Sequence, residues 1–321
     1  MEKRALQGPP SILPLYLRAA APMLPGASLL PFVPGGGGEI PEMELELAGV
    51  RADADRVAAY ARVCSFSLRD TLPPTYPHVL AFPLHMAVMA DGGFPFGAVG
   101  LVHVENRIEQ RRPIALGEEL TIRVRPTKLR DHPRGRTFSL LTKVLSGRQI
   151  AWEGTSTMLR RGKTDDSAGT SPSNVRAPSE LHQILPPAEG EFDAVRVEGP
   201  AAGAEWKLGG DLGRRYAAVS GDRNPIHMHS LAAKPLGFPG AIAHGMWTKA
   251  RCLAALEGRL PDAIAVDVRF RKPILLPGKV RLASSSEGDE VDFAVRDAKR
   301  GTPHLEGQVA PLEAKTEDRR N

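Results

Sequence analysis

The same order of predicted elements occurs twice along this 321-residue chain, and this repetition limits the folds open to it more than any other feature. Between the two copies, at residues 163–190, Ser, Thr, Pro, Gly and charged residues replace periodic apolar residues, as is typical of a flexible linker. The length also favours two domains. We therefore expect an N-terminal half at residues 1–162, a C-terminal half at 191–312 and a polar tail at 313–321.

In each half, a short helix and a longer apolar segment precede a series of strand-like runs. Asp53 or Asp55 is expected to cap the first short helix. The other predicted elements span 77–89, 99–108, 120–124, 138–144 and 149–159 in the first half, and 212–219, 242–256, 263–270, 279–283, 290–295 and 304–309 in the second. A long helix before several antiparallel strands predicts an α+β fold.

Two further patterns support this arrangement. The segment from Arg111 to Gly117 matches the segment from Arg271 to Gly278 in Arg, Pro, Ile, Leu and Gly, and both lie between strand-like runs, which favours internal duplication. A sheet wrapped around the helix at 242–256 would bury one face of that helix. That face is expected to hold Ile242, Met246, Ala250, Leu253 and Leu256.

Composition excludes several classes of protein. The net charge is +5, but basic residues alternate with acidic ones, so we expect no nucleic-acid partner; a basic balance also suits a phosphate-bearing substrate such as coenzyme A. Cys64 and Cys252 have no paired spacing, which argues against a disulfide scaffold. No run of about eighteen apolar residues occurs, and prolines interrupt the N-terminal segment. We expect a cytoplasmic protein without a membrane segment.

The most informative stretch is a turn-rich loop in the second half. It reads Ser220-Gly221-Asp222-Arg223-Asn224-Pro225-Ile226-His227. Pro225 fixes its own φ and keeps Asn224 out of helical space, so the loop is stiff. A stiff loop can aim Asp222 and His227 at one water molecule, which general acid–base catalysis requires.

A second stretch, residues 237–246, places Gly and Pro just before an apolar helix. Backbone N–H groups at a helix N-terminus have no intrahelical partner and favour negative charge. A thioester carbonyl that gains enolate character would be stabilised there. Gly245 would let the backbone approach such a ligand closely. His244 is expected to pack or hydrogen-bond near the helix start rather than to act as a base.

These residues resemble the hydratase 2 signature of the MaoC-like family, which includes (R)-specific enoyl-CoA hydratases and (3R)-hydroxyacyl-thioester dehydratases. The likeness lies in the Ser-Gly-Asp-x-Asn-Pro-Ile-His run at 220–227 and in Ile-Ala-His-Gly-Met at 242–246. With the two-half layout, the chain resembles the double hot-dog dehydratases, in which two antiparallel sheets each wrap around a central helix. A degenerate N-terminal half there precedes a catalytic C-terminal half.

The resemblance implies reversible hydration of trans-2-enoyl thioesters to (3R)-3-hydroxyacyl thioesters, in fatty-acid or related lipid metabolism. Asp222 and His227 would hold the attacking water, and the Gly245 amide would bind the thioester oxygen. Asn224 would order the loop, and its neighbours Ser220, Gly221 and Pro225, with His244, would shape the loop or contact substrate. No cofactor is implied. The substrate would be an acyl-CoA or acyl-carrier-protein thioester, and the protein could form a homodimer.

The chain departs from the family pattern in three places. The Ser found on the central helix of some relatives has no match, since the region reads Arg251-Cys252-Leu253. His229 replaces an acidic residue two places after the catalytic His. The first half lacks the signature, and its segment Pro77–Met89 is apolar instead. We expect this half to hold the acyl chain or to close the dimer-like sheet, without chemistry of its own.

Three other interpretations compete with this one. His227, His229 and His244 could form a metal site, but they lie in a Pro-bounded loop with Asp222 as the one nearby carboxylate, so we expect no metal. A hot-dog thioesterase would share the fold without the Asp-x-Asn-Pro-x-His loop. A non-catalytic acyl-thioester-binding or scaffold subunit would not need the Asp222 and His227 pair.

Overall fold

The computed structural model describes residues 1–20, 38–98, 100–162 and 203–312. Its first half contains, in order, strand β1 (Glu2–Leu6), helix α1 (Ile12–Ala20), strand β2 (Met43–Val50), helices α2 (Ala54–Cys64) and α3 (Tyr76–Met89), and strands β3 (Val102–Gln110), β4 (Leu120–Pro126), β5 (Arg130–His132), β6 (Gly135–Ser146) and β7 (Gln149–Arg161).

The second half contains strand β8 (Glu205–Leu208), helices α4 (Leu212–Ser220), α5 (Pro225–Met228) and α6 (Ser230–Ala233), and the short 3-10 helix η4 (Lys234–Leu236). Helix α7 (Gly245–Leu256), the 3-10 helix η5 (Glu257–Arg259) and strands β9 (Ile264–Phe270), β10 (Gly278–Glu287), β11 (Glu290–Asp297) and β12 (Pro303–Pro311) follow. All elements predicted from the sequence are present, with their ends shifted by a few residues.

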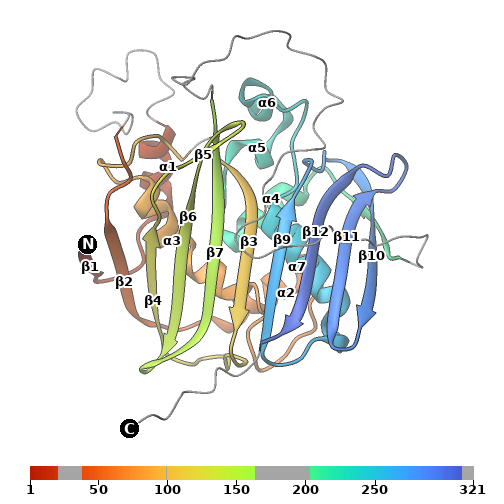
Figure 1. Cartoon of the computed structure of the whole chain (residues 1–321), viewed down its shortest axis with the longest axis horizontal. Coiled ribbons are helices and arrows are strands. Elements are labelled where there is room, and N and C mark those ends of the chain that lie inside the picture. The colour runs from red at the N-terminus through yellow and green to blue at the C-terminus, as the bar shows by residue number, and fades with distance from the viewer. Residues whose placement is uncertain (21–37, 99, 163–202, 313–321) are drawn as a thin grey trace.

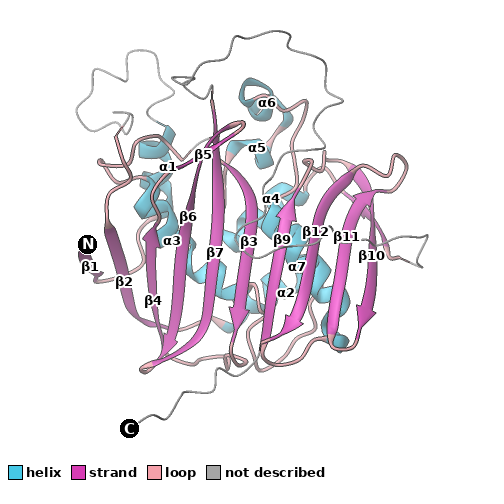
Figure 2. Ribbon diagram, viewed as in Figure 1, coloured by secondary structure: helices cyan, strands magenta, loops and turns pink. Residues whose placement is uncertain are grey.

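The two predicted sheets join edge to edge into one. The strand order is β1-β2-β4-β6-β7-β3-β9-β12-β11-β10-β8, and β5 pairs with β6. The junction is the antiparallel pair β3 and β9, which runs from Glu105 opposite Arg269 to Gln110 opposite Ile264. The helices lie along one face of this curved sheet (Figures 1 and 2). The α+β double hot-dog prediction is confirmed.

The core lies between the sheet and the central helices α3 and α7. Helix α3 is apolar on nearly every side, which is typical of a buried helix, and eight of its residues are buried. On α7, the predicted stripe at Met246, Ala250, Leu253 and Leu256 is buried as expected. Ile242 is also buried but precedes the helix, where it pairs with Leu275.

Matching hydrogen bonds show that the two halves are structural repeats. Helices α2 and α4 both end in a left-handed residue, Ser65 with φ 65° and Gly221 with φ 79°. Beyond these caps, the Leu72 N–H donates to Ile114 O and the Ala243 N–H donates to Ile274 O. The acceptors lie in the two segments whose sequences matched, so the predicted duplication is present in the structure.

Some elements were not predicted. Strands β1, β2, β5 and β8 and helix α1 have no counterpart in the sequence interpretation, because they are short or follow proline-rich sequence. Asp53, one of the two proposed caps, does cap α2 by accepting the Arg56 N–H. Cys64 and Cys252 are buried and unpaired. The predicted linker at 163–190 and the tail at 313–321 lie outside the described residues.

Among the described residues, no helix is both long enough and apolar enough to cross a membrane.

Candidate active site

The loop after α4 has the rigid geometry that its sequence predicts. Gly221 ends α4 in a left-handed conformation and donates its N–H to Ala217 O at 3.0 Å. The Ser220 hydroxyl accepts the Asp222 N–H at 3.2 Å. Asn224 then caps α5 by accepting the Ile226 N–H, and Pro225 occupies the first helical position. These bonds fix the backbone on both sides of Asp222.

Asp222 lies at the centre of the site with 29% of its side chain exposed. Its Oδ1 accepts the Asn224 N–H at 3.1 Å and the Tyr16 hydroxyl at 2.9 Å. Partial burial raises the pKa of Asp222, but the neighbouring imidazoles and these hydrogen bonds lower it by more. The carboxyl is therefore ionised at neutral pH and can accept further hydrogen bonds.

His227 comes from α5 and is buried, with its Nδ1 2.8 Å from Ile242 O. Because a carbonyl oxygen only accepts, Nδ1 must carry the hydrogen and Nε2 holds the lone pair. Burial lowers the pKa of His227, so the ring is neutral at neutral pH. Asp222 and His227 thus offer two proton acceptors in one site.

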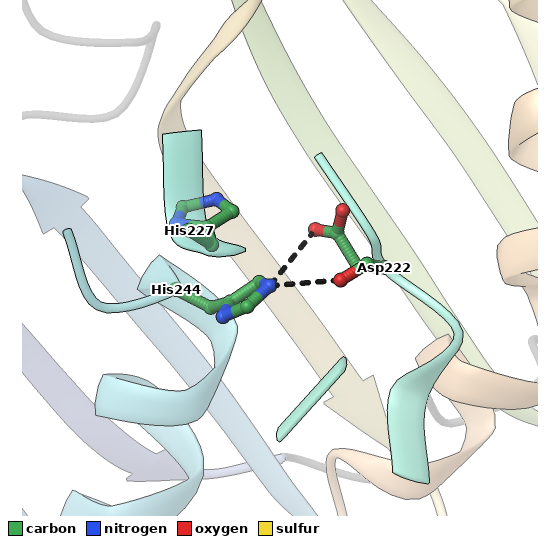
Figure 3. Close-up of side chains that lie close together, drawn as sticks. All are labelled: Asp222, His227 and His244. Carbon is green, nitrogen blue, oxygen red and sulfur yellow. Dashed lines mark hydrogen bonds and ion pairs between the residues drawn. The ribbon is translucent and has the colours of Figure 1, made fainter. Parts of the chain in front are cut away.

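His244 precedes α7 and stacks on His227 with ring centroids 3.7 Å apart (Figure 3). Its Nε2 lies 3.0 Å from the backbone oxygen of Asp222 and 3.8 Å from Oδ2 of the same residue. The contact with the carbonyl requires a hydrogen on Nε2. Burial, with the adjacent His227, lowers the pKa of His244 to about 3. The nitrogen that faces Asp222 is therefore a donor, as expected for a packing role.

Gly245, the first residue of α7, lines the same pocket as Asp222 and His227. A Cβ at this position would lie 2.9 Å from the Phe270 ring, so packing against β9 already requires a glycine. The first N–H groups of α7 have no intrahelical partner, which favours an oxygen ligand with partial negative charge.

The pocket has a volume of about 330 Å³ and extends from the loop into the first half. Five residues of α3 line it: His78, Val79, Phe82, His85 and Met89. The segment predicted as an apolar wall therefore also contributes histidines. Burial lowers the pKa of His78 to about 4, so this ring is uncharged at neutral pH.

A third histidine, His103 on β3, stands beside the two on α3. Its ring centroid lies 6.1 Å from that of His78 and 5.1 Å from that of Phe270. Burial, together with the neighbouring His78, lowers the pKa of His103 to about 3. Four cationic side chains also line the pocket: Arg134, Arg161, Arg271 and Lys272. The pocket is therefore lined by neutral histidines and by cationic side chains that give it a positive electrostatic potential.

A metal site is the alternative to test against this geometry. Asp222, His227 and His244 each offer a potential ligand atom, and these atoms lie within 4.8 Å of one another. However, a metal ligand must present a lone pair, whereas the His244 Nε2 that faces Asp222 carries a hydrogen. His229 is exposed and lies outside the residues that line the pocket. This hydrogen-bond pattern fits a polar catalytic site better than a coordination site.

The first half differs from the second at the equivalent place in three ways. Phe66 follows the left-handed cap Ser65 where Asp222 follows Gly221. Asp70 and Ala241 each lie two residues before the hydrogen bond that the halves share. Asp70 is five positions after the cap Ser65, whereas Ala241 is twenty positions after Gly221, so the first half does not contain the segment that carries His227. After the shared hydrogen bond, Pro73 and Pro74 stand where the second half has His244 and Gly245. Proline has no N–H to donate.

Comparison with known proteins agrees with this arrangement. A family model described as MaoC like domain matches residues 202–308. The 3-hydroxyacyl-thioester dehydratase X of Mycobacterium tuberculosis is 40% identical over 303 residues, which cover 94% of this chain and 99% of that protein. The chain belongs to the MaoC-like dehydratase family.

Solved structures of MaoC-like proteins have the same fold. The crystal structure of HtdX from Mycobacterium tuberculosis matches with a TM-score of 0.70 and 36% identity, over 84% of this chain and 100% of that one. A MaoC-like dehydratase from Phytophthora capsici matches with a TM-score of 0.65 and 21% identity, over 85% and 96%. The second likeness shows that the double hot-dog arrangement is shared at low identity.

Sequence reasoning also missed Tyr16. Its hydroxyl contacts Asp222 from α1, although the two residues are 206 positions apart. The N-terminal segment offered prolines and a charged start but no motif, so no local signal pointed to this contact.

Proposed function

We propose that this MaoC-like protein catalyses the reversible hydration of trans-2-enoyl thioesters to (3R)-3-hydroxyacyl thioesters, a lyase reaction of fatty-acid metabolism. One observation carries the proposal: an ionised Asp222 and a neutral His227 stand together in a pocket beside the N-terminus of α7. The dehydratase name of the relative that matches along nearly the whole chain supports the same reaction.

The two acceptors suit the activation of one water molecule. A water that donates one hydrogen to Asp222 and the other to His227 Nε2 directs an oxygen lone pair at the substrate. That oxygen bonds to the β carbon, the pair takes one proton from the water, and the pair returns one proton to the α carbon. The sum of these transfers is the addition of one H₂O, and dehydration is the reverse.

Negative charge that develops on the thioester oxygen needs a donor, and the Gly245 N–H is the one we propose. It is the first amide of an α-helix of twelve residues and belongs to the pocket lining. Because the amide is fixed in place before the reaction, it stabilises the enolate-like state without reorganising. His244 supports this geometry by holding the Asp222 backbone against the start of α7.

The four cationic side chains of the pocket support a substrate that carries phosphate, either acyl-CoA or an acyl-carrier-protein thioester. The first half supplies the acyl wall through α3 and has no catalytic residues of its own in this proposal. The division into residues 1–162 and 191–312, a homodimer and a cytoplasmic location stay predictions.

The test follows the ultraviolet absorbance of short- and long-chain trans-2-enoyl-CoA, with the product captured by an (R)-specific 3-hydroxyacyl dehydrogenase. We expect wild-type turnover, and losses of about 10²-fold or more in Asp222→Asn and in His227→Ala, because each removes a positioned proton acceptor.

Two exposed residues provide matched controls, Asp211→Asn and His229→Ala, and both should keep wild-type activity. Full activity in folded Asp222→Asn and His227→Ala would refute the assignment. A folded protein that binds every enoyl thioester without turnover would instead favour the scaffold subunit, and release of free coenzyme A would favour a thioesterase.

A further inference from the structure

Helix α1 lies outside both structural repeats yet reaches the active-site loop. It follows β1, which extends the sheet beyond β2 in parallel register and is tied to the segment after α3 by an ion pair between Arg4 and Asp91 at 2.8 Å. Ile12 and Tyr16 occupy the inward face of α1, since the Ile12 side chain packs over Gly221. The helix thus covers the outer side of the loop that carries Asp222.

The hydrogen bonds of Tyr16 fix the direction of its hydroxyl. The oxygen accepts the Arg223 N–H at 2.7 Å, so its own hydrogen must point elsewhere. The available acceptor is Asp222 Oδ1, 2.9 Å away. Burial, together with the charge of Asp222, raises the pKa of Tyr16, so the hydroxyl stays protonated. Tyr16 is therefore a permanent donor to the carboxylate.

The two oxygens of Asp222 have different partners. Oδ1 receives hydrogen bonds from Tyr16 and from the Asn224 amide. Oδ2 lies 3.8 Å from His244 Nε2, on the side of the two imidazoles. We propose that Tyr16 is a positioning residue for the hydration reaction: it locks Oδ1 on the outer side, presents Oδ2 to the reacting water, and keeps the carboxylate ionised. This inference rests on the proposed function for its catalytic consequence.

Other groups also act on the charge of Asp222. Asn224 and Arg223 neighbour it on the loop, Tyr216 lies on α4, His227 lies on α5, and His244 precedes α7. His78 of α3 and His103 of β3 interact with it from the first half. The Tyr16 hydroxyl adds a direct hydrogen bond that stabilises the charge of the carboxylate.

The test is Tyr16→Phe, which removes the hydroxyl and keeps the ring. Loss of one hydrogen bond to a charged group costs a factor of about ten or more, so kcat should fall by about tenfold and the pKa of the Asp222 carboxyl should rise by about one unit. KM should change little, because Tyr16 does not line the pocket. Leu17→Ala, at the next and exposed position of α1, is the control and should leave kcat and the Asp222 pKa unchanged.

A double-mutant cycle separates positioning from general support of the fold. In an Asp222→Asn background no carboxylate is left to orient, so adding Tyr16→Phe should have no further effect on residual turnover. An equal loss of activity in both backgrounds, or an unchanged kcat in the folded single variant, would overturn the proposal.

A second measurement does not depend on turnover. Titration of the Asp222 carboxyl carbon by NMR, assigned through Asp222→Asn, should show a higher pKa in Tyr16→Phe than in the wild type. If no enoyl thioester is hydrated but this pKa rises, the proposed function fails and the positioning contact stands. An unchanged carboxyl pKa would refute the contact whatever the activity.

Discussion

At the scale of single residues, the site depends on a glycine that lies outside the pocket lining. A Cβ on Gly213 of α4 would lie 1.9 Å from the carbonyl oxygen of His227, and this neighbour is backbone rather than a flexible side chain. Helix α5 can therefore rest directly on α4 only because residue 213 has no side chain. The position of the His227 ring follows from that contact.

We expect Gly213→Ala to lower turnover by tenfold or more, because α5 must move away and a small displacement of a catalytic group is costly. Thermal unfolding and the hydration assay would measure the two effects. Gly258→Ala is the matched control, since its Cβ would meet nothing within 4 Å and its φ is not positive. Unchanged activity in Gly213→Ala would show that the loop adapts freely.

Site residues close to one another in the sequence could be predicted, and those far apart could not. Asp222, Asn224 and His227 could be predicted because their relative placement is set by a loop of six residues with Gly and Pro at fixed positions. Tyr16 could not, because its contact joins residues 206 positions apart through a helix without a sequence motif. The polar character of the pocket wall was missed because His78 and His85 lie within an otherwise apolar helix.

At the scale of elements, α3 forms one wall of the pocket. Its buried residues pack on the sheet while its other face lines the pocket, so one helix serves as both core and wall. Met89, at the C-terminal end of this helix, is buried and belongs to the lining. A larger side chain at this end should restrict the pocket and leave the catalytic loop untouched.

We expect Met89→Trp to lower kcat/KM for long-chain enoyl-CoA by about tenfold relative to short-chain enoyl-CoA, because the larger side chain takes up space in the pocket and overpacking has a cost of this size. The ratio across a panel of chain lengths is the measurement. Met89→Leu conserves volume and should keep the wild-type ratio. If Met89→Trp keeps the wild-type ratio of long-chain to short-chain kcat/KM, the acyl chain does not lie beside Met89.

At the scale of the whole molecule, one buried lysine ties the two halves together. Lys249 of α7 is fully buried, and its Nζ donates to Asn106 O, Asn106 Oδ1 and Val266 O at 3.1, 2.6 and 3.0 Å. These three acceptors match the three hydrogens of an ammonium group. They belong to β3 and β9, the strands at which the sheets of the two halves meet.

We expect Lys249→Met to lower the free energy of unfolding by roughly 1–3 kcal/mol, because buried acceptors lose their donors. Urea unfolding followed by fluorescence would measure this. Lys143→Met, at an exposed site with one ion pair to Glu153, should stay within about 0.5 kcal/mol of the wild type. A Lys249 variant as stable as the wild type would show that the junction does not need this contact.

The overall architecture was more predictable than its junction. Repeated helix and strand periodicity predicted two similar halves, since each half must bury its own central helix. The pairing of β3 with β9 could not be predicted in the same way, because strand pairing across the two halves leaves no local pattern. Strand β2 was missed although burial alternates over its first five residues, because it follows a proline- and glycine-rich segment.

The prolines of the first half limit what a substitution there could restore. Pro73 and Pro74 replace the residues that provide His244 and the Gly245 amide in the second half, and the first half is also shorter by the segment that carries His227. An Asp placed at position 66 would supply neither the amide donor nor the imidazole. No single substitution therefore gives the first half the set of groups that the second half presents.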